Sequence, residues 1–220
     1  MKRRIAHILD LLGAEYGRPE WQEGEPPLYE LILTILSQNT ASVNTRRAYA
    51  NLRAEFPDWE SVRTANVSEI ADAIRVGGLA EIKATRIKSI LQSIYEKQGK
   101  LDLDWFRSAE SDDIRDYLLK FPGVGEKTAA CVLLFSLGRP ILPVDTHVYR
   151  VSRRVGLIQP KVGVEESHRV LQEMVPEDQI YEFHVNFIRH GRKVCKAPKP
   201  KCLACIIKGE CDYFARHYAT

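Results

Sequence analysis

Apolar residues recur at helical intervals along almost the whole chain, and this pattern restricts the possible folds more than any other feature. Stripes with three- and four-residue spacing include Ile5, Ile8, Leu9 and Leu12; Leu28, Leu31, Ile32, Ile35 and Leu36; and Ile87, Ile90, Leu91 and Ile94. Short breaks containing Gly or Pro separate them, and no segment shows the strict alternation of a half-buried strand. Asn66 followed by Glu69 predicts a helix start with a reciprocal cap. The sequence therefore predicts an all-α protein.

The size and composition are those of an ordinary globular protein. The chain has 220 residues, of which 45% are hydrophobic and 28% are charged, enough for one large domain or two compact lobes. No apolar run approaches the roughly 18 residues that a membrane span needs. The basic start, Met1 to Ile5, is not followed by the apolar core and cleavage site of a signal peptide. We expect a cytoplasmic, nucleoid-associated protein with no targeting signal and no membrane partner.

A turn rich in glycine separates two helical patterns in the middle of the chain. The first pattern ends near Leu118, the turn is Pro122-Gly-Val-Gly125, and a second helix is predicted to begin near Glu126. Gly123 and Gly125 permit a tight turn with exposed backbone N–H groups. Beside a helix N-terminus, such donors can bind a phosphate without reading the bases.

Lys127 lies in the first turn of this second predicted helix. A nucleotide phosphate loop is excluded, because it needs contiguous Gly-Lys-Thr and Glu126 separates Gly125 from Lys127. An ordinary lysine is neutral in only about one molecule in 2,500 at pH 7. The helix end and partial desolvation would both lower the lysine pKa, which favours a nucleophilic amine. The alternative is a solvated lysine or a simple phosphate contact.

Four of the five cysteines lie close together near the C-terminus. Cys195, Cys202, Cys205 and Cys211 have the spacing Cys-x6-Cys-x2-Cys-x5-Cys, whereas Cys131 lies in an apolar stretch and is expected in the core. Without a secretion signal, a disulfide framework is not expected. Four thiolates can hold zinc or a [4Fe–4S] cluster. Structural zinc sites usually use two close pairs and this chain has one, Cys202 and Cys205; zinc and a redox Cys-x-x-Cys pair remain the alternatives to a cluster.

A basic segment surrounds the first of these cysteines. From Phe187 to Gly209 there are seven Lys or Arg residues and no Asp or Glu. Three of them, Lys196, Lys199 and Lys201, lie between the first two cysteines of the motif. A loop folded around a cluster would present these cations to phosphate, although charge alone fits a solvated basic tail equally well.

The turn, Lys127 and a downstream Val144–His147 segment together resemble the helix–hairpin–helix DNA glycosylase superfamily, and the cysteine spacing resembles its endonuclease III members. The resemblance runs from about Leu28 to Cys211. It implies a monomer with two α-helical lobes. Residues 27–139 would form the lobe with the hairpin, and residues 1–26 plus 140–220 would form the lobe with the C-terminal [4Fe–4S] loop.

The resemblance also implies roles for individual residues. Lys127 would attack the sugar C1′, expel the base and form a Schiff base that permits β-elimination. Asp145 would stabilise cationic charge on the sugar and shuttle protons; its alternative role as a helix N-cap is compatible with this. A carboxylate near Lys127 raises the lysine pKa, so Asp145 is not expected to activate the amine. His147 is expected to be structural.

Gln38 matches a glutamine that, in the resembling family, fills the space left by an extruded nucleotide. Thr40 matches a threonine that follows it, but Ala41 replaces the aspartate common in members that act on pyrimidines. The alternative is a helix end followed by caps at Asn39 or Ser42.

The predicted function is therefore a bifunctional glycosylase and abasic-site lyase that removes oxidised pyrimidines from damaged double-stranded DNA. One alternative is a monofunctional glycosylase for mismatched or alkylated bases, against which Lys127 argues. Another is a DNA-binding or redox-sensing module without catalysis, against which the pair Lys127 and Asp145 argues. The preferred lesion is not predicted, because several helices assemble the base pocket.

Overall fold

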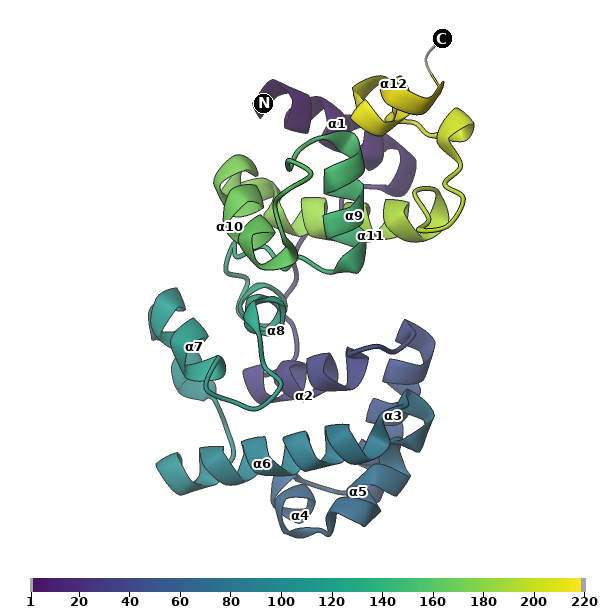
Figure 1. Cartoon of the computed structure of the whole chain (residues 1–220). Coiled ribbons are helices and arrows are strands. Elements are labelled where there is room, and N and C mark those ends of the chain that lie inside the picture. Colours follow the sequence, from purple (N-terminus) through teal and green to yellow (C-terminus); the bar gives the residue numbers. More distant parts are fainter. Residues whose placement is uncertain (1, 219–220) are drawn as a thin grey trace. The chain divides into compact units, whose positions relative to one another are not determined.

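The computed structural model describes residues 2–218, which form helices and connecting turns with no β-strand among them (Figure 1). The predicted all-α class is confirmed. In this described part, no helix combines the length and apolar character needed to cross a membrane.

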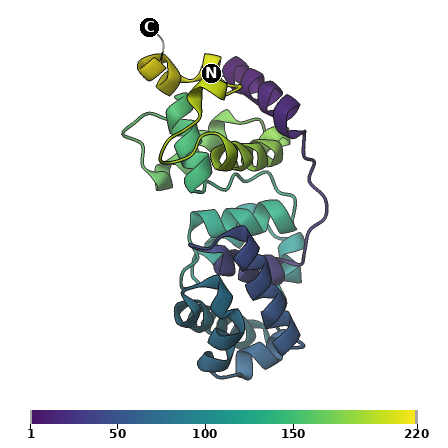
Figure 2. The same ribbon diagram turned by 90° about the vertical axis from the view of Figure 1, so that its right-hand side faces the viewer.

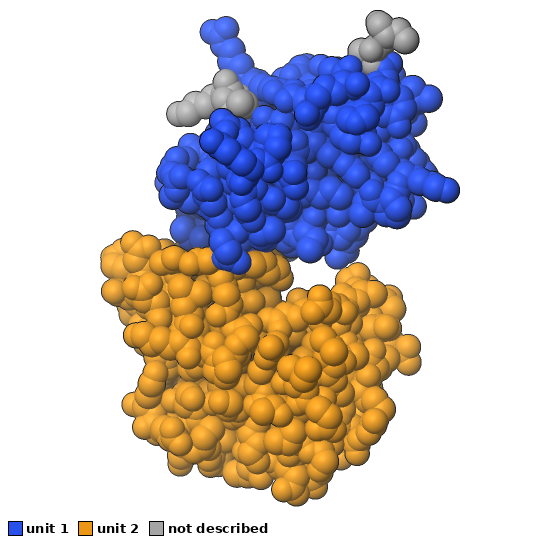
Figure 3. All heavy atoms as spheres, viewed as in Figure 1, with its two compact units in different colours: residues 1–22, 140–220 blue, residues 23–139 orange. Residues whose placement is uncertain are grey.

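The chain divides into two compact units, coloured separately in Figure 3. The hairpin unit is Glu23–Arg139, and the cysteine unit combines Met1–Gln22 with Pro140–Thr220. Residue 1 and residues 219–220, at the ends of the lobe predicted over 1–26 plus 140–220, lie outside the described residues.

The observed division after Gln22 precedes the boundary expected near Pro26. The intervening segment is tied to the helix that ends the hairpin unit, because the Ser136 hydroxyl donates a 2.6 Å hydrogen bond to the Glu25 carbonyl. A hydrogen bond between residues so far apart in sequence cannot be read from local patterns. The segment before the second helix therefore belongs to the hairpin unit.

The hairpin unit is a succession of helices of very different length around one apolar core. Its elements are α2 (Pro27–Ser37), α3 (Ser42–Glu55), α4 (Trp59–Thr64), α5 (Val67–Ile74), η1 (Arg75–Gly77), α6 (Ala80–Gln98), η2 (Asp104–Arg107), α7 (Ser111–Leu118), α8 (Glu126–Cys131) and η3 (Val132–Ser136). The predicted cap before α5 is present, since the Glu69 carboxylate accepts a 2.7 Å hydrogen bond from the Asn66 N–H. The α2 stripe is buried, as expected, and Cys131 lies in the core.

The cysteine unit combines helices from both ends of the chain and carries the C-terminal cysteine loop. Its elements are α1 (Lys2–Tyr16), α9 (Thr146–Val155), α10 (Val164–Met174), η4 (Glu177–Gln179), α11 (Ile180–Lys193), η5 (Cys202–Ala204), η6 (Lys208–Glu210) and α12 (Asp212–Tyr218). Helix α11 packs against both α1 and α9, although α1 is far from them in sequence (Figures 1 and 2). The apolar stripe of α1 is buried in the core of the cysteine unit.

Candidate functional site

The hairpin connects α7 to α8 through a turn that requires a glycine. Gly123 has a φ of +77°, and a Cβ there would lie only 2.6 Å from Nε of Arg86. Gly125 is extended and is the N-cap residue of α8. Across the turn, Nε of Arg115 on α7 donates a 2.8 Å hydrogen bond to the carboxylate of Glu126, the first residue of α8. The Arg115–Glu126 pair therefore links α7 to α8 across the hairpin turn.

Lys127 occupies the first turn of α8, as predicted, and is half-buried. Helix α8 packs against α2. The charge of Lys127 acts on the carboxyl of Glu30 and lowers its pKa.

Glu30 was not predicted as a site residue. Burial outweighs the effect of Lys127 and raises the pKa of Glu30 to about 7. Oγ1 of Thr34, one helical turn further on, donates a 3.0 Å hydrogen bond to Oε1 of Glu30. The sequence signal was available, because Glu30 and Thr34 are polar residues four apart within an otherwise apolar helix.

Gln38 lies just past the end of α2 and makes two hydrogen bonds. Its Nε2 donates to the Gly123 carbonyl at 2.9 Å, and Nη1 of Arg86 donates to its Oε1 at 2.9 Å. Asn39 follows with a left-handed φ of 52°, and α3 begins at Ser42 without a side-chain cap. The structure thus brings the predicted glutamine to the hairpin, in contact with the predicted Gly123.

A buried lysine secures the segment that carries Gln38. Lys83 is 1% exposed, and its Nζ donates hydrogen bonds to the carbonyls of Leu36 (2.8 Å) and Gly77 (2.9 Å) and to Oγ1 of Thr40 (2.6 Å). Burial lowers the pKa of Lys83. Three acceptors satisfy its three N–H groups. No local pattern singled out this residue, since two of its three partners, Leu36 and Thr40, are far from it in sequence.

Asp145 belongs to the cysteine unit and is the N-cap of α9. Its Oδ1 accepts hydrogen bonds from the backbone N–H groups of His147 (2.8 Å) and Val148 (2.7 Å). The capping role considered for this residue is therefore present. His147 contacts Arg150 at 3.0 Å through Nδ1, and its Cβ would lie 2.9 Å from a Cβ at Gly191 on α11. His147 thus has the structural surroundings that were expected.

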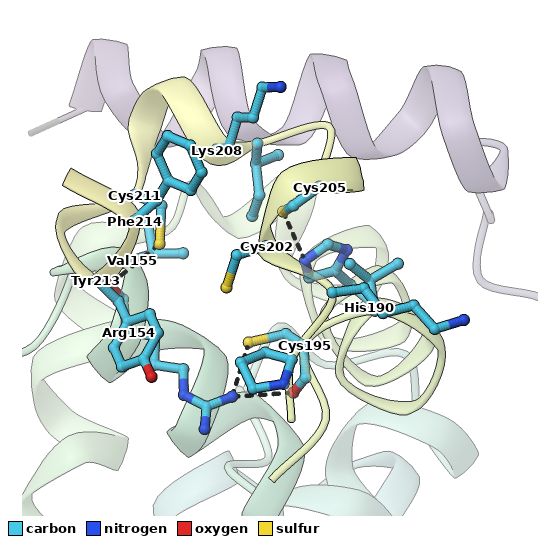
Figure 4. Close-up of a pocket in the computed structure, with 14 residues that line it drawn as sticks. Arg154, Val155, His190, Cys195, Cys202, Cys205, Lys208, Cys211, Tyr213 and Phe214 are labelled. Atoms are coloured by element: carbon cyan, nitrogen blue, oxygen red, sulfur yellow. Dashed lines mark hydrogen bonds between the residues drawn. The ribbon is translucent and has the colours of Figure 1, made fainter. Parts of the chain in front are cut away.

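The four predicted cysteine ligands line one cavity in the cysteine unit (Figure 4). Burial raises the pKa of the Cys205 thiol to about 11 and also raises that of Cys211. Buried thiols of this kind stay neutral until a cation compensates their charge.

Hydrogen-bonding groups adjoin these sulfurs. Nη1 of Arg154 donates to Sγ of Cys195 at 3.4 Å, and Nε2 of His190 lies 3.5 Å from Sγ of Cys205. The same Arg154 guanidinium donates to the carbonyls of Lys196 (2.7 Å) and Ala197 (2.9 Å). Arg154 therefore binds the thiol of Cys195, a predicted cluster ligand, and the backbone of the two residues that follow Cys195.

Four cysteine thiols that border one cavity are a donor set that fits a [4Fe–4S] cluster. Among residues 2–218, no three His, Cys, Asp or Glu side chains are grouped to hold a metal ion. A zinc ion would need its sulfurs about 2.3 Å from one point. A [4Fe–4S] cluster takes four thiolates around a larger body, and four thiols border this cavity.

The three loop lysines project into solvent, as a phosphate-binding role requires. Lys196, Lys199 and Lys201 are all exposed, and Lys199 has a left-handed φ of 68°. No sequence rule would place a lysine in that conformation, which β-carbon sterics disfavour.

A family model described as HhH-GPD superfamily base excision DNA repair protein matches residues 32–177, more than half of the chain. The chain belongs to this family. The matched region contains the hairpin, Lys127 and Asp145.

Individual relatives agree with this membership. Endonuclease III of Thermotoga maritima is 34% identical over 190 residues, which cover 86% of this chain and 84% of that protein. The putative DNA glycosylase At3g47830 of Arabidopsis thaliana is 36% identical over 173 residues, or 79% of this chain, but these span only 59% of the plant protein. A solved structure of a non-covalent Endonuclease III–DNA complex superposes with a TM-score of 0.84 at 27% identity, over 98% of this chain and 97% of that one. The resemblance to endonuclease III is confirmed.

Proposed function

We propose that this member of the HhH-GPD superfamily is a bifunctional DNA glycosylase and abasic-site lyase for oxidised pyrimidines in duplex DNA. One observation carries the proposal. Lys127 lies, half-buried, in the first turn of the helix that follows the hairpin. An amine in this place can serve as the nucleophile that a lyase requires.

The proposed reaction proceeds by covalent catalysis. The lone pair of the neutral Lys127 amine attacks C1′ of the damaged nucleoside, the bond from C1′ to the base breaks, and the base leaves with the bonding electrons and takes up a proton. Opening of the sugar ring gives a Schiff base between Lys127 and C1′. Loss of a proton from C2′ then expels the 3′ phosphate. Asp145 would stabilise the positive charge that develops on the sugar.

Several residues are proposed to bind the DNA. The backbone at Gly123 and Gly125 would contact phosphate, and the exposed lysines of the cysteine loop would add cations. Gln38 would enter the duplex when the damaged nucleotide is extruded. Its contact with the Gly123 carbonyl supports a common surface for the hairpin and Gln38.

A [4Fe–4S] cluster is proposed on the four cysteines that line the cavity. Cys195, Cys202, Cys205 and Cys211 would hold it as thiolates, and Arg154 would orient Cys195. When bound, the cluster supplies structural cross-linking of the loop. Iron and zinc analysis of anaerobically purified protein tests this, and stoichiometric zinc would contradict it.

Borohydride trapping tests the chemistry. Wild-type protein and a duplex with an abasic site or thymine glycol should give a covalent adduct, and Lys127→Ala should reduce it to background. Lys120→Ala is a matched control, because Lys120 is an exposed lysine on the same hairpin. No adduct from wild-type protein that contains its iron would favour a monofunctional or non-catalytic protein. An adduct retained in Lys127→Ala would identify another amine as the nucleophile.

A further inference from the structure

A buried histidine of the cysteine unit connects the N-terminal helix to one of the predicted cluster ligands. His190 lies in the last turn of α11 and is 1% exposed. The hydroxyl of Tyr16, the last residue of α1, lies 3.1 Å from its Nδ1. On the other side of the ring, Nε2 points toward Sγ of Cys205 at 3.5 Å (Figure 4). One side chain therefore joins segments from both ends of the chain.

The backbone of the same residue contacts a second predicted ligand. The His190 carbonyl accepts hydrogen bonds from the N–H groups of Val194 and Cys195, both at 2.9 Å. The carbonyl thus holds the first cysteine of the motif, and the ring contacts the third. His190 therefore fixes two of the four cysteines relative to each other.

Sulfur is a poor partner for a buried ring nitrogen unless the sulfur is charged. His184, also buried on α11, has its Nδ1 2.8 Å from the backbone carbonyl of Pro143. A neutral thiol is a much weaker hydrogen-bond partner than a carbonyl, and a buried N–H without a good acceptor costs free energy. A thiolate is a strong acceptor. The contact of His190 with Cys205 is therefore satisfied best when Cys205 is a metal ligand.

We propose that His190 is a positioning residue for the cluster, and that its Nε2–H donates a hydrogen bond to the thiolate of Cys205. A cysteine that binds iron has no proton to donate, so the hydrogen of this contact belongs to Nε2. Tyr16 then donates its O–H to Nδ1 of the neutral ring, which fixes the orientation and the tautomer of His190. This inference rests on the cluster proposed above and assigns no step of base removal to His190.

The ring of His190 is one of two donors at the Cys205 sulfur. The other is the backbone N–H of Ile207. Arg154 donates to Cys195 and to the backbone that follows it. The backbone donor remains when a side chain is replaced, so a substitution at position 190 isolates the contribution of the ring.

The proposed hydrogen bond has two measurable consequences. It draws negative charge from the sulfur, which stabilises the reduced form of the cluster over the oxidised form and raises the reduction potential. It also holds the Cys205 side chain in the geometry of a ligand. Loss of a residue that orients a metal ligand in this way typically weakens metal binding by about 10- to 100-fold.

The test compares variants of the anaerobically purified protein by reduction potential and by iron release to a chelator. His190→Leu has no donor, so its reduction potential should be lower than that of wild type, and it should release iron about tenfold faster. His190→Gln, whose amide can place an N–H near the position of Nε2, should recover most of the potential. His184→Leu is the matched control, because it removes another buried histidine from α11, and both values should equal those of wild type.

A second variant decides the matter if His190→Leu fails to fold. Tyr16→Phe keeps the aromatic ring and removes only the hydroxyl beside Nδ1, so the potential should shift in the same direction by a smaller amount. A wild-type potential in His190→Leu or in Tyr16→Phe, or equal potentials in His190→Leu and His190→Gln, would overturn the inference and leave the proposed function intact. Wild-type protein without iron would instead overturn the proposed cluster and this inference together.

Discussion

The hairpin and the cysteine loop are both short, irregular segments, but different kinds of interaction hold them. The hairpin turn is fixed by groups that the chain itself supplies, since Arg115 binds Glu126 and Gln38 binds the Gly123 carbonyl. The cysteine loop consists of two short 3₁₀ turns around a cavity lined by thiols. Arginines outside the loop also anchor it: Arg154 and Arg150 donate to its first residues, and Arg4 donates to the Glu210 carbonyl.

This difference indicates how each region should respond to perturbation. A network of direct hydrogen bonds keeps its geometry without a cofactor, whereas a cavity bordered by four thiols would gain cross-links from the proposed cluster. Substitutions near the hairpin should therefore change chemistry, and substitutions in the cysteine loop should change cofactor content and DNA affinity.

The largest effect is expected from Asp145→Asn, which removes the negative charge of the side chain and keeps an oxygen that can cap α9. The asparagine oxygen can still accept from the N–H groups of His147 and Val148, so α9 should remain capped. Loss of the carboxylate should lower the single-turnover trapping rate on the order of 10²- to 10³-fold. Thermal denaturation should be close to wild type, whereas Asp145→Ala should lose about 1 kcal/mol. Full activity in Asp145→Asn would show that the residue is only a cap.

Cys205→Ser should disrupt the structure of the cysteine loop and leave the structure of the hairpin unchanged. We expect loss of iron and of visible absorbance, and a DNA affinity about tenfold weaker with a smaller salt dependence, because a few phosphate contacts are lost. Trapping by Lys127 at saturating DNA should persist. Cys131→Ala is the control, since Cys131 is buried in the hairpin unit and should leave the iron content unchanged. An equal loss of iron in both variants would refute the distinction.

Glu30→Gln should change the pH dependence of stability. The folded-state pKa of about 7 lies above the ordinary value of 4.5, so the folded protein binds this proton more tightly than the unfolded chain. The wild-type free energy of unfolding should therefore fall as pH rises from 4.5 to 7. Glu30→Gln lacks this decline and should be more stable than wild type by about 2 kcal/mol above that window, after allowing for partial exposure. Urea denaturation across the pH range measures this, and parallel curves would contradict it.

The smallest effect is expected from Arg86→Ala, which weakens the contact between Gln38 and the hairpin. Loss of the 2.9 Å hydrogen bond to Gln38 should reduce nucleotide extrusion about fivefold, or about 1 kcal/mol. Fluorescence of 2-aminopurine beside the lesion measures extrusion directly. Arg86→Lys, which keeps the charge and one donor, should lie between wild type and Arg86→Ala. Unchanged extrusion in both variants would remove Arg86 from the site.

The features predicted from sequence depend on local spacing. The buried stripes of α1 and α2, the cap before α5 and the hairpin with α8 after it follow from residues within a few positions of one another. The cysteine motif placed four thiols along one cavity for the same reason, because its spacing is short. Local chemistry was sufficient for these elements.

The features that escaped prediction depend on contacts between distant segments. In the sequence Lys83 is one polar residue in a helical pattern, and only the fold supplies its acceptors at Leu36 and Thr40. Arg86 gains its role from Gln38, and Arg154 gains its role from the backbone after Cys195. The π-helical turn of η3, directly after α8, has no sequence signature of its own.

Helix α9 joins two parts of the cysteine unit that differ in chemistry. Asp145 caps its first turn, and near its other end Arg154 contacts Cys195 while the Arg154 carbonyl accepts from Sγ of Cys211. Ten residues of α-helix form a stiff rod of about 15 Å. A single rigid element therefore joins the carboxylate proposed to act on the sugar to the loop proposed to hold the cluster.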